Sequence, residues 1–96
     1  MKLQDRTLFI PGCRVQHFKR ELADAATLAE EPMLYLYEIV GIAQDTETGE
    51  ELMIYRPLYG EKKLYARPLA MFLSPVDREK YPDVRQEYRF ALYTGA

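Results

Sequence analysis

The residues best suited to chemistry in this 96-residue chain include a single histidine and a single cysteine. Cys13 and His17 lie four residues apart in a segment that alternates apolar and polar side chains, which predicts a strand. A strand rises about 3.3 Å per residue, so the two side chains would lie about 13 Å apart, too far for a nucleophile and its base. His17 has no identifiable nucleophile or oxyanion hole, so a small enzyme using His17 is only a remote alternative. We expect a rim histidine and no catalysis.

A second group of residues, rich in tyrosine, is typical of a binding surface. Tyrosine rings offer an apolar surface with a polar end, and an isolated glycine permits close approach to the backbone. A guanidinium can grip a carboxylate or a phosphate. The candidate ligand-binding residues are Tyr55, Tyr59, Gly60, Tyr65, Arg67 and His17. The structural alternative is an arginine stacked on tyrosine to cover a small fold.

The sequence predicts no metal site and no cofactor. One Cys and one His cannot supply the usual four zinc ligands, and the five glycines are isolated rather than grouped in a phosphate-binding loop. A single cysteine excludes an intramolecular disulfide and fits a reducing compartment. No stretch approaches the roughly 20 apolar residues that cross a bilayer. We therefore expect a cytoplasmic protein without membrane association.

The net charge of -2 hides an uneven distribution. Residues 21–55 contain nine acidic side chains and no Lys or Arg, whereas residues 1–20 and 56–96 carry net charges of +4 and +3. Such a separation of charge favours self-association as readily as an outside ligand, so a homodimer is a candidate assembly. The acidic middle and a pI near 5.4 count against nucleic-acid binding without excluding it.

The elements that must position these residues are short. Residues 19–32 have helical spacing, with Asp24 as a candidate N-cap and Pro32 as the stop. Residues 69–73 are expected to form one apolar helical turn. Strands are expected at 13–18, 33–43, 52–58, 64–67 and 87–92.

The loop Asp45–Glu50 predicts a hairpin with Gly49 in the left-handed region. If Thr46 pairs with Glu50, Ile42 lies opposite Ile54 and Val40 lies opposite Arg56. This register separates two faces. The aliphatic face holds Leu34, Leu36, Glu38, Val40, Ile42, Leu52, Ile54, Arg56 and Leu58, and the tyrosine face holds Tyr35, Tyr37, Ile39, Gly41, Ala43, Met53, Tyr55, Pro57 and Tyr59. The aliphatic face is expected to form the core, and the tyrosine face is expected to be a half-exposed binding or dimer surface or, equally, a cover for the fold.

An ordered set of motifs supports a comparison with a known family. Pro11-Gly12 and His17-Phe18-Lys19 come first, and further motifs follow as Tyr37–Ala43, Thr46–Glu50, Tyr55–Gly60, Tyr65–Leu69 and Met71–Leu73. Together they make the chain resemble a small bacterial family known as domain of unknown function 1653. The resemblance implies an SH3-type barrel and transfers no activity. Against the family pattern, residues 20–34 are an insertion.

The expected fold is therefore a single domain over residues 1–96, mainly β. It is a small SH3-like antiparallel barrel with a short inserted helix and an apolar helical turn after the fourth strand. The expected function is a binding or interaction module that recognises a protein or peptide. The alternative is binding of RNA or single-stranded nucleic acid along Lys62, Lys63 and Arg67.

Overall fold

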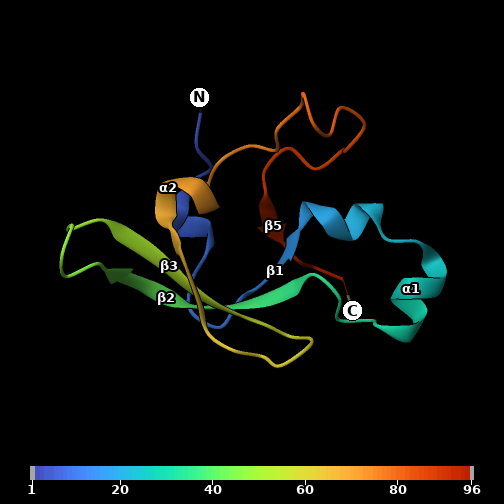
Figure 1. Ribbon diagram of the computed structural model, residues 1–96, viewed down its shortest axis with the longest axis horizontal. Helices are drawn as coiled ribbons and strands as arrows, with labels where there is room; N and C mark the ends of the chain where they lie inside the picture. The colour runs from blue at the N-terminus through green and yellow to red at the C-terminus, as the bar shows by residue number, and fades with distance from the viewer. Residues whose placement is uncertain (1, 96) are drawn as a thin grey trace.

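The computed structural model describes residues 2–95, which form a five-stranded antiparallel sheet with short helical segments (Figure 1). The order of strands in the sheet is β4-β3-β2-β1-β5. The strands are β1 (Arg14–His17), β2 (Leu36–Gln44), β3 (Glu51–Pro57), β4 (Tyr65–Pro68) and β5 (Phe90–Leu92). The helical segments are η1 (Arg6–Leu8), η2 (Phe18–Leu22), α1 (Ala25–Glu30) and α2 (Leu69–Phe72).

The sheet does not close into a barrel, so the predicted SH3-like closure is wrong. Edge strands β4 and β5 have no ladder between them within residues 2–95. Pro68 ends β4 without a backbone N–H to donate, and the chain turns directly into α2. Just before β5, Tyr88 forms an isolated bridge with Pro75 instead. The two edges meet only through side chains, with the Arg67 guanidinium 5.6 Å from the centre of the Phe90 ring.

The register of the β2–β3 hairpin differs from the predicted one. Ile42 lies opposite Met53 rather than Ile54, and the register shifts again between Ile39 and Gly41, so that Val40 has no partner. The reason is the loop, in which the N–H of Asp45 donates to the carbonyl oxygen of Glu50 at 2.8 Å and leaves four residues between them. The predicted turn had three. Gly49 does adopt the predicted left-handed conformation, with φ of 77°.

The two faces of the hairpin are also reversed. Tyr37 and Tyr55 of the predicted half-exposed face are 7% and 3% exposed, whereas Val40 of the predicted core face is 38% exposed. Leu36 is the only member of the predicted aliphatic face that is fully buried. Large aromatic rings remove more apolar surface from water than aliphatic side chains do, so the tyrosine face is the better core.

The core is built from contacting aromatic rings. Phe72 of α2 stacks on Phe90 of β5 with ring centres 4.1 Å apart. Tyr55 meets both rings edge to face at 5.3 and 5.5 Å, and Tyr37 meets Tyr55 at 5.4 Å. Fully buried Val15 and Met53 fill the space around the rings. The rings thus link the edge strand β5 to the middle of the sheet without a closing ladder.

Both predicted helical features are present, but the first is shorter than residues 19–32, because its first residues form the separate 3-10 segment η2. Helix α1 begins after Asp24, whose carboxylate accepts a hydrogen bond from the N–H of Thr27 at 2.7 Å, as expected of an N-cap. The apolar turn after β4 is α2, which buries Leu69 and Phe72. No helix within residues 2–95 is long and apolar enough to cross a membrane.

Candidate functional site

Every strand of the sheet contributes a side chain to one hollow on its inner face, which we call the central cleft. Its first part, the aromatic lobe, has a volume of about 220 Å³. The lobe has ring walls and two cationic side chains, and is lined by His17, Lys19, Tyr35, Tyr37, Tyr55, Tyr65, Arg67 and Phe90. The curled sheet brings these residues together although they span most of the chain.

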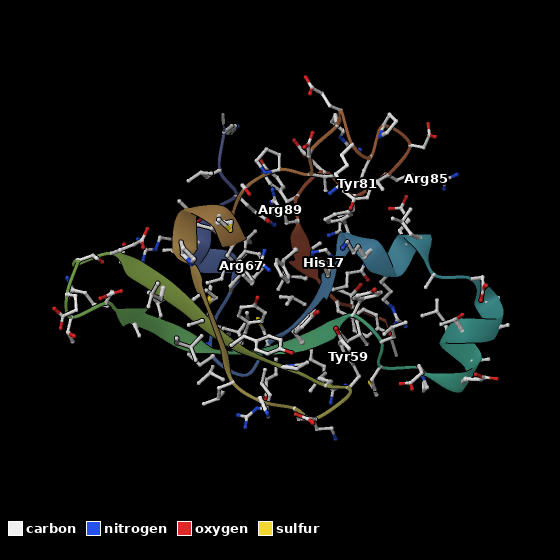
Figure 2. All side chains as sticks on the ribbon, viewed as in Figure 1. His17, Tyr59, Arg67, Tyr81, Arg85 and Arg89 are labelled. Atoms are coloured by element: carbon white, nitrogen blue, oxygen red, sulfur yellow. The ribbon has the colours of Figure 1, made fainter. Side chains whose placement is uncertain are left out.

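A second part, the cationic lobe, adjoins the first and has a volume of about 280 Å³. The two lobes share the lining residues His17, Lys19 and Arg67, so they lie next to each other, and we treat them together as the central cleft. The cationic lobe is completed by Phe18, Asp77, Lys80, Tyr81 and Arg89. Figure 2 shows His17, Arg67 and Arg89 gathered near the middle of the molecule, while Arg85 points outward.

Two arginines in the cleft are held through one nitrogen each. Nε of Arg67 donates to the Tyr55 hydroxyl at 3.1 Å, and Nε of Arg89 donates to the Ser74 hydroxyl at 2.8 Å. Neither guanidinium has a carboxylate within 4.0 Å in the described part of the chain. Both pairs of terminal nitrogens therefore remain available as planar donor forks.

The positive charge of the cleft is only weakly balanced. Lys19 and Lys80 also lack an ion-pair partner among residues 2–95. In the described part of the chain, the one acidic side chain that lines the cleft is Asp77, and its carboxylate accepts hydrogen bonds from the backbone N–H groups of Glu79 and Lys80. Four cations thus face one carboxylate that is already hydrogen-bonded, which favours an anionic ligand.

His17 adds a neutral donor to the cleft. Its Nδ1 accepts a hydrogen bond from the N–H of Lys19 at 3.1 Å, so the proton of the neutral ring is on Nε2. Burial, followed by the positive charges of Arg67, Lys19 and Arg89, lowers the pKa of His17 to about 4. At neutral pH the ring is therefore uncharged and donates through Nε2.

The tyrosine hydroxyls at the edge of the cleft are paired. The hydroxyls of Tyr37 and Tyr59 lie 2.8 Å apart, and the Tyr59 ring also packs edge to face on Tyr35 at 6.0 Å. Burial raises the pKa of both Tyr37 and Tyr59 above the usual value for a phenol. Both hydroxyls therefore stay protonated at neutral pH and add no negative charge.

The structure brings together four of the six candidate ligand-binding residues. His17, Tyr55, Tyr65 and Arg67 line the aromatic lobe, although Tyr55 presents little more than its hydroxyl because its ring is buried. Tyr59 does not line the lobe itself but packs against two residues that do, Tyr35 and Tyr37. Gly60 is exposed in the turn after β3, with φ of 64°, and does not line the cleft.

Sequence reasoning missed three of the cationic residues. Lys19 could have been predicted from the sequence, because it belongs to the motif His17-Phe18-Lys19. Lys80 and Arg89 come from the segment between α2 and β5, which has almost no regular structure. No periodicity in such a segment indicates which side chains point inward. Hydrogen bonds from Arg78 to the carbonyl oxygens of Val84 and Gln86 hold this segment in place.

Two other hollows flank Leu3 beside α2, with volumes of about 410 and 450 Å³. Their walls are mostly aliphatic. The charged pair Arg6 and Glu51 at one end is joined by a hydrogen-bonded salt bridge, and Glu50 stands beside it. Arg89 also lines the larger of these hollows, but neither has an aromatic side chain among its described lining residues, so the central cleft is the stronger candidate site.

Comparison with known proteins gives a family but no function. No curated protein and no solved structure matches the chain. The model of the family described as "Protein of unknown function (DUF1653)" matches residues 13–92, a range that contains the whole sheet and every residue that lines the central cleft. Because this match covers most of the chain, the protein belongs to the DUF1653 family.

Proposed function

We propose that the protein is a binding module that takes an anionic side chain of a partner protein or peptide into the central cleft. The observation that carries this proposal is the convergence of four unpaired cations on a hollow with aromatic walls. Clusters of arginine recognise acidic or phosphorylated motifs in other binding modules by charge-assisted hydrogen bonds.

The division of the cleft into two small lobes suits a single side chain. The lobes measure about 220 and 280 Å³, each below the roughly 300–1,000 Å³ that is typical of pockets for drug-sized ligands. A single side chain on an extended segment needs less room. The rest of that segment would lie across the mouth of the cleft, where Tyr65 is 46% exposed.

The state of His17 supports binding rather than catalysis. A general base needs a free ring nitrogen to accept a proton. Nδ1 of His17 is already bonded to the N–H of Lys19, and Nε2 carries the proton. His17 is therefore suited to donate a hydrogen bond to a bound anion.

The proposal can be tested with a fluorescently labelled peptide of four consecutive glutamates, titrated by anisotropy at low ionic strength. We expect saturable binding that weakens about tenfold in Lys19→Ala, because one charge-assisted contact to the bound anion is lost. Lys63→Ala is the matched control, since Lys63 pairs with Glu61 at 3.0 Å on the β3–β4 turn outside the cleft. Its affinity should be unchanged.

A labelled mixed-sequence single-stranded RNA of similar length is titrated in parallel. Tighter binding of the RNA than of the peptide, lost in both Lys19→Ala and Lys63→Ala, would favour the nucleic-acid alternative along Lys62, Lys63 and Arg67. Absence of peptide binding, or equal loss in both lysine variants, would refute recognition through the cleft. Sedimentation of the unliganded protein at the same concentrations would test the predicted homodimer.

A further inference from the structure

We propose that the side chain the cleft accepts is phosphotyrosine, with its ring in the aromatic lobe and its phosphate in the cationic lobe. This inference rests on the proposed function and specifies its ligand. The two lobes share His17, Lys19 and Arg67, so a ring bound in one lobe would lie next to an anion bound in the other. In phosphotyrosine the phosphate is likewise close to the ring, joined to it through the phenolic oxygen alone.

The donors suit a tetrahedral dianion better than a carboxylate. One guanidinium fork comes from Arg67 on β4 and another from Arg89 just before β5, and each is fixed by its Nε. A carboxylate has two oxygens, which a single fork satisfies. A phosphate monoester has three terminal oxygens and a charge of about -1.5 to -2 at pH 7. It can therefore use both forks and the ammonium groups of Lys19 and Lys80.

The aromatic lobe favours a ring over an aliphatic side chain. Tyr35 and Tyr65 present rings to it, buried Phe90 lies beneath, and aromatic pairs gain from edge-to-face contact beyond simple burial. Tyr65 is the most exposed of the three and packs edge to face on Tyr55 at 5.7 Å. An incoming ring would cover Tyr65. A phosphoserine or glutamate would reach the cations without filling this lobe.

The test compares three acetylated and amidated hexapeptides that differ only at their central residue, which is tyrosine, phosphotyrosine or glutamate. Affinities are measured by isothermal titration at constant ionic strength. We expect the phosphotyrosine peptide to bind at least about tenfold more tightly than the other two. Arg89→Gln should remove most of this difference. Arg85→Gln is the matched control, because Arg85 lies on the same segment and its side chain points outward (Figure 2).

Arg89 also contacts Ser74, so Lys80→Ala provides a second variant whose side chain is exposed and joins no ion pair within residues 2–95. It should reduce binding of the phosphotyrosine peptide and leave the melting temperature unchanged. Equal affinities for the phosphotyrosine and glutamate peptides would overturn this inference while leaving the proposed function intact. No binding of any peptide would refute both. The inference would also be overturned if adenosine monophosphate displaced the phosphotyrosine peptide at concentrations below that of the peptide.

Discussion

His17 offers a quantitative check of the electrostatics of the cleft. It is the only histidine in the chain, and burial together with Arg67, Lys19 and Arg89 lowers its pKa from 6.5 to about 4. The unfolded chain therefore binds a proton at His17 at a higher pH than the folded protein does. Stability from this group is complete above pH 6.5 and is lost as the pH falls from 6.5 towards 4.

Between pH 7 and pH 5, a pKa of 6.5 in the unfolded chain and about 4 in the fold would reduce the free energy of unfolding by about 1.8 kcal/mol. His17 is only partly buried, and solvent screens part of the repulsion from its cationic neighbours. We therefore expect a loss of about 1 kcal/mol that is attributable to this residue.

The assay is urea unfolding at pH 7 and pH 5 for the wild type and His17→Asn. Asparagine keeps an acceptor for the N–H of Lys19, because Asn is a favoured N-cap, but it does not titrate. Carboxylates with lowered pKa values, such as those of Asp24 and Glu51, are present in both proteins and cancel in the comparison. The wild type should lose about 1 kcal/mol more than the variant. An equal loss in both proteins, or an NMR titration midpoint near 6.5 for His17, would refute the reasoning.

Three further predictions test the fold. Met53→Ala should cost about 2–5 kcal/mol in urea unfolding, while Val40→Thr should cost less than about 1 kcal/mol; equal costs would contradict the observed faces of the hairpin. Glu21→Ala removes a carboxylate that accepts hydrogen bonds from two backbone N–H groups in the loop before β5. Hydrogen exchange of those amides should therefore accelerate without global unfolding. Tyr59→Phe leaves the hydroxyl of Tyr37 without its partner and should cost about 1 kcal/mol in thermal unfolding.

Local features of this fold follow from the sequence, and long-range ones do not. Asp24 as a helix cap and Gly49 in a left-handed turn depend on a few neighbouring residues, and both were predicted correctly. The hairpin register depends on one additional loop residue and on the unpaired Val40, neither of which the alternation of side chains reveals. The same error of one residue assigns partners to the wrong positions along the whole hairpin.

The choice of core face was wrong for a different reason. Four tyrosine hydroxyls on one face of a strand pair suggest contact with water, because each hydroxyl needs a hydrogen-bond partner when buried. In the structure Tyr37 bonds with Tyr59, and Tyr55 accepts from Arg67. These partners come from the turn after β3 and from β4, so only the folded sheet supplies them.

The candidate site shows the same division. Arg67 and Tyr65 share one strand and were identified from the chemistry of an aromatic ring beside a guanidinium. Their neighbours Lys80 and Arg89 belong to the irregular segment between α2 and β5, and tertiary hydrogen bonds determine the path of that segment. The sequence therefore indicated an aromatic surface with one arginine. The fold adds three cations and turns that surface into a cleft.

The proposed function requires that the cleft, and no other surface, receives the anionic side chain of a partner. The most direct measurement is a map of backbone amide chemical shifts during titration with the tetraglutamate peptide. We predict that the shifted amides cluster at His17, Lys19, Arg67 and residues 77–89, while those of the hairpin loop 45–50 stay in place. Shifts confined to that loop or to the hollows beside α2, or no shifts at saturating peptide, would contradict the account.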